Sequence, residues 1–230
     1  MTRWPLYGVL LAGLVALGAC GGGGDDAAPL TLEQRVSGEA DAPGSQVDPV
    51  ETPIAVAGID DAGSLPELLF TPEQEDVAAM EKAGLASGLV DTRFFPSEPG
   101  AEHAGDEVHV ATLVMQFASD DDAADMAGVL HGDGLEPCPG SCAVDISEFE
   151  VDGIPDAQGV ARTQTAENLE ATGAEGDPFS AYSISFADGP FAYEVTLFAF
   201  GPPGRISQDQ LGEIAKNLYE RVEGSPPSQQ

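Results

Sequence analysis

Residues 180–200 of this chain, Ser-Ala-Tyr-Ser-Ile-Ser-Phe-Ala-Asp-Gly-Pro-Phe-Ala-Tyr-Glu-Val-Thr-Leu-Phe-Ala-Phe, predict a β-hairpin. Tyr182, Ile184 and Phe186 alternate with small residues, and a period of two is typical of a strand that buries one face. We therefore expect these three side chains to point inward and the serines outward. Asp188-Gly189 is a strong signal for a tight turn, and residues 191–200 then form the returning strand.

Further strand patterns lie toward the N-terminus. Residues 108–117 are apolar at nearly every position, which predicts a central strand covered on both faces. Residues 146–151 and 159–165 predict a second hairpin. Residues 50–56 could form an edge strand, although Pro49, just before this segment, and Pro53, within it, weaken that pattern.

The last helix has the clearest helical pattern in the chain. It is expected to begin after Ser207, with Gln210 completing a capping box, and Gly224 stops it. Its apolar residues recur three and four positions apart, which predicts one continuous buried stripe: Leu211, Ile214, Ala215, Leu218, Tyr219 and Val222.

Two earlier helices are expected to begin at Thr71 and at Ser119, and Thr31-Leu32-Glu33-Gln34 is a possible capping box for a short one. Residues 90–106 and 167–177 are rich in polar residues and glycine and are expected to be loops. The order of helix, strand, helix, four strands and helix predicts a single α+β domain. We expect this domain to span residues 31–224, with a mostly antiparallel sheet of about five strands, helices packed on one face, and a disordered tail at 225–230.

Composition narrows the possible functions. The chain has 230 residues, of which 42% are hydrophobic, so it can bury a sizeable core. It carries 40 Asp and Glu against 8 Lys and Arg, a formal net charge of -32. Such acidity argues against nucleic-acid binding, because binding to phosphates needs Lys and Arg. It also argues against electrostatic docking on anionic lipid.

The N-terminus has the features of an export signal. Arg3 precedes a mostly apolar run over residues 6–19, which is too short and too rich in glycine for a membrane span. Leu17-Gly18-Ala19-Cys20 resembles the lipobox of bacterial lipoproteins. The resemblance implies a signal peptide at 1–19, acylation of Cys20 (palmitate), and a tether over 20–30 that anchors the protein to the outer face of the cell membrane. The alternative is an ordinary cleaved signal that ends near a cysteine.

The body of the chain resembles uncharacterised extracytoplasmic α+β lipoproteins of high-GC Gram-positive bacteria, and this resemblance implies fold and location only. Its two remaining cysteines, Cys138 and Cys142, are separated by Pro-Gly-Ser. In an exported chain this spacing favours a disulfide that closes a tight loop. Thiol exchange and a zinc site remain as alternatives, although the spacing departs from the usual redox motif and His131 is the only other nearby ligand.

No motif in the sequence predicts catalysis, a metal site or a cofactor. His103 and His109 match no metal-binding spacing. The acidic run Asp120–Asp122 with Asp125 is contiguous and lacks the glycine of a calcium loop, so we expect it to stabilise a helix N-terminus. We therefore expect a non-enzymatic binding module for an unknown protein or small molecule. The alternatives are a hydrolase with an unrecognised site and an accessory or sensor subunit of a membrane protein.

Overall fold

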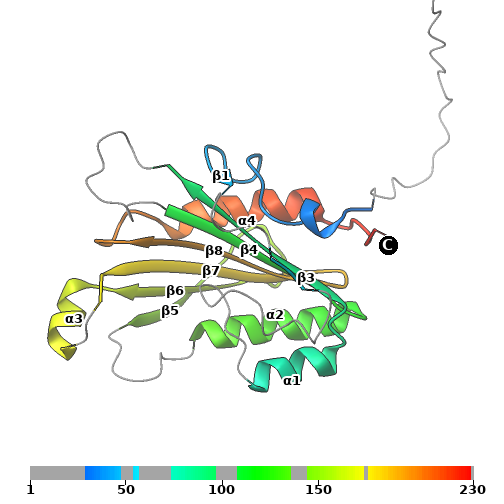
Figure 1. Cartoon of the computed structure of the whole chain (residues 1–230), viewed down its shortest axis with the longest axis horizontal. Helices are drawn as coiled ribbons and strands as arrows, with labels where there is room; N and C mark the ends of the chain where they lie inside the picture. Colours follow the sequence, from blue (N-terminus) through cyan, green and yellow to red (C-terminus); the bar gives the residue numbers. More distant parts are fainter. Residues whose placement is uncertain are drawn as a thin grey trace, which may run out of the picture.

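The computed structural model describes residues 29–47, 54–56, 74–96, 108–135, 144–173 and 176–228 (Figure 1). Cys20, His103, Cys138 and Cys142 lie outside the described residues, as does the expected helix start at Thr71. The described elements are the 3-10 turn η1 (Leu32–Gln34), β1 (Gln46–Val47), β2 (Ile54–Val56), α1 (Gln74–Ala83), β3 (Ser87–Phe95), β4 (Val108–Gln116), α2 (Asp120–Leu135), β5 (Asp145–Phe149), β6 (Gln158–Gln164), α3 (Ala166–Thr172), β7 (Phe179–Asp188), β8 (Phe191–Phe200) and α4 (Gln208–Val222).

One antiparallel sheet dominates the fold and confirms the predicted α+β class. Its strands follow the order β1-β3-β4-β8-β7-β6-β5, and β2 also pairs with β3. The hairpin of β7 and β8 has Ile184 opposite Val195, and Gly189 in its turn adopts a positive φ of 54°. The predicted number of strands was wrong, since seven described strands lie along this order and β2 is an additional one, against about five expected.

Strand β3 corrects the loop predicted from residue 90. Its nine residues pair with β4 along their whole length, with Leu89 opposite Val114. The sequence pattern does not predict this strand because two adjacent polar residues, Asp91 and Thr92, interrupt its apolar residues. Both are nevertheless buried in the structure. Pairing with the long apolar strand β4 decides the conformation here. Tertiary context routinely overrides local preference in strands.

A second predicted loop, residues 167–177, contains helix α3. The Thr165 side chain caps it by accepting a hydrogen bond of 3.1 Å from the backbone N–H of Asn168. Gly173 ends it in the left-handed conformation, with φ of 67°. This is the usual C-terminal glycine of a short helix.

Helices cover both faces of the sheet, which corrects the expectation that they lie on one. In Figure 1, α4 lies on one side of the sheet, and α1 and α2 lie on the other. Successive residues of β8 take part in the two cores: Tyr193 packs in the cluster that holds Leu218 of α4, and Ala192 packs in the cluster that holds Met126 of α2. Ile184 and Phe186 are buried on the α4 side as predicted, and Tyr182 is partly buried against the same cluster.

The serines of β7 were expected to face solvent, and this was wrong for two of them. Ser180 and Ser185 are both only 3% exposed. Ser185 lies opposite Glu194 of β8, on the face that α2 covers. Ser180 lies on the opposite face, together with Ile184 and Phe186, so both faces of β7 hold a buried serine.

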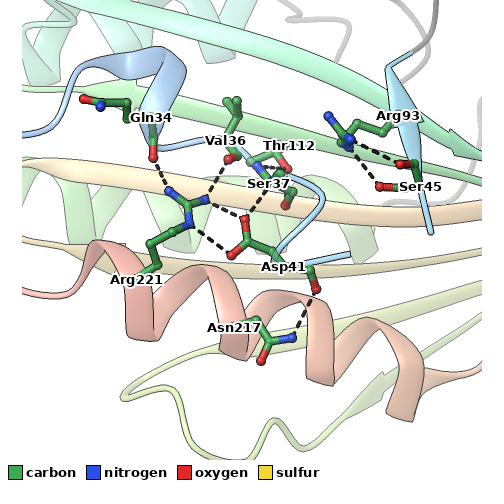
Figure 2. A network of polar contacts seen from close by, with 10 residues as sticks. Gln34, Val36, Ser37, Asp41, Ser45, Arg93, Thr112, Asn217 and Arg221 are labelled. Atoms are coloured by element: carbon green, nitrogen blue, oxygen red, sulfur yellow. Dashed lines mark hydrogen bonds and ion pairs between the residues drawn. The ribbon is translucent and has the colours of Figure 1, made fainter. Parts of the chain in front are cut away.

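The N-terminal segment 31–45 is fastened across the α4 side by Arg221, as Figure 2 shows. The guanidinium of Arg221 donates two hydrogen bonds to the carboxylate of Asp41, at 3.0 and 2.6 Å, and others to the carbonyls of Gln34 and Val36. Asn217, one helical turn earlier, donates to the Asp41 carbonyl at 3.1 Å. Because the Asp41 side chain is only 2% exposed, this bidentate pair is shielded from water and salt.

A second arginine fastens both ends of the described chain. Arg35 is fully buried, with its guanidinium 3.7 Å from the centre of the Phe191 ring. It donates to the Tyr193 hydroxyl at 2.9 Å and to the backbone carbonyl of Ser225. Residues 225–228 therefore pack against the fold, in the segment where the sequence predicts a disordered tail.

Candidate functional site

A groove runs along one side of α2, between this helix and the segment that joins β5 to β6. We call it the α2 groove. It consists of two adjoining hollows of about 480 and 360 Å³, and Gln158 lines both. The first hollow is lined by Asp120, Asp121, Ala124, Ala127, Gly128, Pro155, Asp156, Gln158, Ala187 and Gly189, and the second by His131, Glu148, Phe149, Glu150, Ala157, Gln158 and Gly159.

The acidic wall of the first hollow follows from the way α2 begins. Ser119 accepts a hydrogen bond of 3.2 Å from the Asp122 backbone N–H, so it caps the helix, and the aspartates follow in the first turn, where the helix dipole favours them. This confirms the predicted helix start after Ser119. Asp120 and Asp121 are exposed and face the hollow.

Asp156 faces these two aspartates from the opposite wall. It adopts a φ of 54°, and among the described residues it is the single non-glycine with a positive φ. Aspartate tolerates this left-handed conformation better than most residues. The backbone turn at Asp156 thus contributes a third carboxylate to the first hollow.

The floor of the groove is built from small residues. At Gly128, in the middle of α2, a Cβ atom would meet nothing within 4 Å, whereas at Gly134 it would lie 3.1 Å from the Val160 side chain. A Cβ at position 134 would therefore be tightly packed against Val160, whereas one at 128 would have open space. Glycine inside a helix costs about 1 kcal/mol relative to alanine, so Gly128 lowers helix stability and leaves the groove deeper.

His131 lies at the far end of the groove. This residue is only 8% exposed, and its Nε2 lies 3.0 Å from Oε1 of Glu148, a mostly exposed side chain. Its Nδ1 is buried and has no hydrogen-bond partner among the described residues. Among the described residues, the imidazole ring therefore has one hydrogen bond, to a carboxylate that solvent or a ligand can reach.

Four of the described arginines donate hydrogen bonds to backbone carbonyls of the fold. Arg162 donates to the carbonyls of Asp133 and Gly134 in the last turn of α2, at 2.6 and 2.8 Å. Arg35, Arg205 and Arg221 also donate to backbone carbonyls of their own chain. No lysine or arginine is among the residues that line the two hollows. The groove therefore concentrates negative charge that its own lining does not neutralise.

Glu194 lies under α2 but outside the groove. It is buried in the middle of β8, and loss of solvation raises the pKa of its carboxyl group to about 7. A hydrogen bond from Ser183 and the charge of Arg162 act in the opposite direction, lowering this pKa. Nothing in the sequence pattern distinguishes Glu194 from the chain's many other carboxylates.

The structure places the residues singled out from the sequence at separate locations. His109 stacks on Phe198, with ring centres 4.8 Å apart, on the sheet. Asp125 and Asp122 line a different hollow of about 300 Å³, together with Lys82 of α1. Within the described residues, no three His, Cys, Asp or Glu side chains converge as metal ligands would. Also within those residues, no helix is long and apolar enough to cross a membrane.

The groove is not apparent from the sequence because its walls come from two segments about 30 residues apart. Glu148 and Glu150 lie in the first strand of the predicted second hairpin, and Asp156 lies between its two strands. The glycines inside α2 were the available signal, since glycine weakens a helix interior.

Comparisons with known proteins add little to this geometry. No known family profile matches the chain. No curated protein sequence matches it either. Its structure is similar to the extracellular domain of PknH from Mycobacterium tuberculosis, with a TM-score of 0.49 and 15% sequence identity, over 84% of this chain and 97% of that one. A likeness at this level carries no inference about function.

Proposed function

We propose that this chain is an extracytoplasmic, lipid-anchored binding module that holds a cationic segment of a partner in the α2 groove. The observation that carries the proposal is the first hollow, where Asp120, Asp121 and Asp156 face one another across a floor of small residues without a lysine or arginine in the lining. A concave surface of one charge sign focuses the electric field and attracts ligands of the opposite sign.

The dimensions of the groove suit an extended peptide. Helix α2 rises about 1.5 Å per residue, so Asp120 and His131 are about 17 Å apart along its axis. An extended chain covers that distance in about five residues, at about 3.3 Å each. Lysine or arginine side chains of such a segment would meet Asp120, Asp121 and Asp156 at one end and Glu148 at the other.

A binding experiment with a fluorescent pentalysine peptide tests the groove, using the full chain in detergent. Exposed ion pairs contribute about 0.2–1 kcal/mol each. The double variant Asp120→Asn/Asp156→Asn should therefore weaken binding about fivefold. The matched control is Asp209→Asn/Glu213→Gln on α4, which removes the same charge from two exposed positions on the opposite side of the sheet.

The control decides whether the groove or the overall charge attracts the peptide. We expect the control variant to bind within about a factor of two of the unmodified chain, because distant exposed charges are screened beyond about 10 Å at 0.1 M salt. Equal weakening by both double variants would refute a local site. Binding would then reflect the net charge of the whole chain.

The anchor is tested separately by Cys20→Ala in the native host. This proposal rests on the lipobox-like residues 17–20, and the change removes the thiol that would be acylated. We expect the variant to leave the membrane fraction. If it remains there in the same proportion as the unmodified chain, the assignment of Cys20 is wrong.

A further inference from the structure

We propose that helix α2 is a pH-sensitive part of the fold: ionisation of Glu194, a carboxyl group buried beneath it, releases the C-terminal half of the helix, residues 128–135, from the sheet. Neither the lipid anchor nor a bound partner is needed for this behaviour, because every group involved lies within the fold. Three features of the molecule support it: the position of this carboxyl group, the contact that fastens the end of α2, and the composition of the helix.

Glu194 lies in the middle of the sheet, where α2 covers it. Its partners in the neighbouring strands are Leu113 of β4 and Ser185 of β7, and the residue is only 7% exposed. Helix α2 contacts both β7 and β8 on this face. Ser183 shares a hydrogen bond of 3.0 Å with Thr196, and it also has a side-chain hydrogen bond with Glu194. These hydroxyl groups replace only part of the solvation that an ionised carboxylate loses on burial, so the protonated form is favoured beneath the helix.

The charged and titratable side chains near Glu194 come from the helix above it and from three strands of the sheet. They share its face of the sheet or belong to the covering helix: Asp133 and His131 of α2, Arg162 of β6, Glu148 of β5 and His109 of β4. The positive charge of Arg162 favours ionisation of Glu194, whereas the negative charge of Asp133 opposes it. Arg162 is therefore the cation that an ionised Glu194 would attract.

Arg162 also holds the C-terminal end of α2 against the sheet. Its guanidinium donates hydrogen bonds to the carbonyls of Asp133 and Gly134, at 2.6 and 2.8 Å. When Glu194 ionises, its carboxylate competes with these two carbonyls for the same guanidinium. Loss of one proton therefore has two effects: it makes burial of Glu194 unfavourable, and it weakens the contact that fastens the helix above.

The C-terminal half of α2 has a low intrinsic preference for helix. It contains Gly128, Gly132 and Gly134, and glycine in a helix interior is destabilising relative to alanine. At Gly128 and Gly132 a Cβ atom would meet nothing within 4 Å, so close packing does not explain glycine there. Low helix stability lowers the free energy needed to open this half while the rest of the domain stays folded. Because His131 belongs to this half, the second hollow of the α2 groove would change shape with it.

The direction of the effect follows from the pKa of the carboxyl group in the two forms. Burial raises the pKa of Glu194 from 4.5 to about 7 while α2 covers it. Contact with water in the open form would return this pKa toward 4.5. The open form then releases the proton at lower pH than the closed form, so opening becomes more favourable as pH rises. Between pH 6 and pH 8 these two values increase the equilibrium constant for opening about tenfold.

Amide hydrogen exchange of the full chain in detergent, followed by mass spectrometry at pH 6 and pH 8, tests the proposal. After correction for the intrinsic pH dependence of exchange, protection of residues 128–135 should fall about tenfold from pH 6 to pH 8. The fall should disappear in Glu194→Gln and persist in the matched control Glu213→Gln, which removes an exposed charge from α4. Histidines change charge in the same pH range, so this pair of variants assigns the effect to Glu194. Gly128→Ala should raise protection about fivefold at both pH values and keep the tenfold fall.

Urea distinguishes local opening from unfolding of the whole domain, because the free energy of unfolding depends on urea in proportion to the surface exposed. At pH 8 we expect the exchange of residues 128–135 to depend weakly on urea and that of α4 to depend strongly on it. Equal protection and equal urea dependence of the two helices at both pH values would refute local opening. Protection of α2 that does not change between pH 6 and pH 8 would show that the closed helix accommodates the ionised carboxylate. A fall that persists in Glu194→Gln would assign the titration to another group. The first two results come from the unmodified chain and do not require that a variant folds.

Discussion

Replacement of Glu194 by glutamine should stabilise the protein at alkaline pH and have little effect at acidic pH. Glu194 lies in the middle of β8 beneath α2, and burial raises the pKa of its carboxyl group from 4.5 to about 7. Glutamine has nearly the same shape and can still accept a hydrogen bond from Ser183. It lacks the charge whose removal from water is the main cost at this position.

The magnitude follows from the shift in pKa. In the unfolded chain this carboxyl group ionises near pH 4.5, and in the folded chain near 7. Between these values the folded state binds a proton that the unfolded state has released, so stability falls as pH rises through this window. The loss is complete above pH 7 and amounts to about 3 kcal/mol, at about 1.4 kcal/mol per pKa unit. The pKa of about 7 already includes the opposing attraction of Arg162 and the hydrogen bond from Ser183, so the variant should gain about 3 kcal/mol above pH 7.

Urea unfolding of the two proteins at pH 4.5, 6 and 8 measures this effect. The free energy of unfolding should be nearly equal at pH 4.5, and the difference in favour of Glu194→Gln should grow steadily to pH 8. Asp91 and Asp188, whose pKa values burial also raises, are present in both proteins and cancel in the difference. Glu213→Gln, which removes one exposed charge from α4, is the control and should show no such growth. A constant difference between Glu194→Gln and the unmodified chain at all three pH values would refute the reasoning.

The remaining predictions concern the rest of the fold. Arg221→Leu should lower the free energy of unfolding by about 3 kcal/mol in urea titrations, because it leaves the buried carboxylate of Asp41 without its ion-pair partner. A loss below about 1 kcal/mol would mean that the Arg221–Asp41 ion pair contributes little to stability. Gly159→Ala should cost about 1–3 kcal/mol, since its Cβ would lie 2.5 Å from the Phe149 ring, and an unchanged thermal midpoint would show that this ring moves aside freely. Intact mass before and after reduction and alkylation should reveal a Cys138–Cys142 disulfide in exported protein, and two free thiols would disprove it. Sodium chloride should raise the melting temperature near neutral pH by screening a formal charge of -32; calcium chloride at matched ionic strength should add little, and a large shift at low-millimolar calcium would reveal a specific cation site.

Local pattern was sufficient where one segment carries its own buried face. The alternation before Asp188-Gly189 predicted the β7–β8 hairpin, and the stripe from Leu211 to Val222 predicted α4, because each pattern repeats at the period of the structure it forms. The helix start after Ser119 was predicted from the residues of its first turn. Capping and dipole effects act within a single turn, so they can be predicted from neighbouring residues in the sequence.

Other features depend on which segments meet in space. The conformation of β3 is set by its pairing with β4, and the burial of Ser185 in β7 depends on helix α2, which packs on that face. The cation Arg221 cannot be assigned to Asp41 from the sequence, since 180 positions separate them. The same holds for the candidate site, because the walls of the α2 groove come together only when the β5–β6 hairpin packs beside the helix.

By itself, therefore, the sequence determined the α+β class, the C-terminal hairpin and helix, and the strongly negative net charge; it also predicts export and the Cys20 anchor. Only the tertiary structure decided that helices cover both faces, that arginines bind backbone carbonyls inside the fold, and that carboxylates from separate segments line one groove. The physical reason is one of range. Periodicity, capping and net charge act along the chain or sum over it, whereas burial, pairing register and groove formation depend on contacts between residues far apart in sequence.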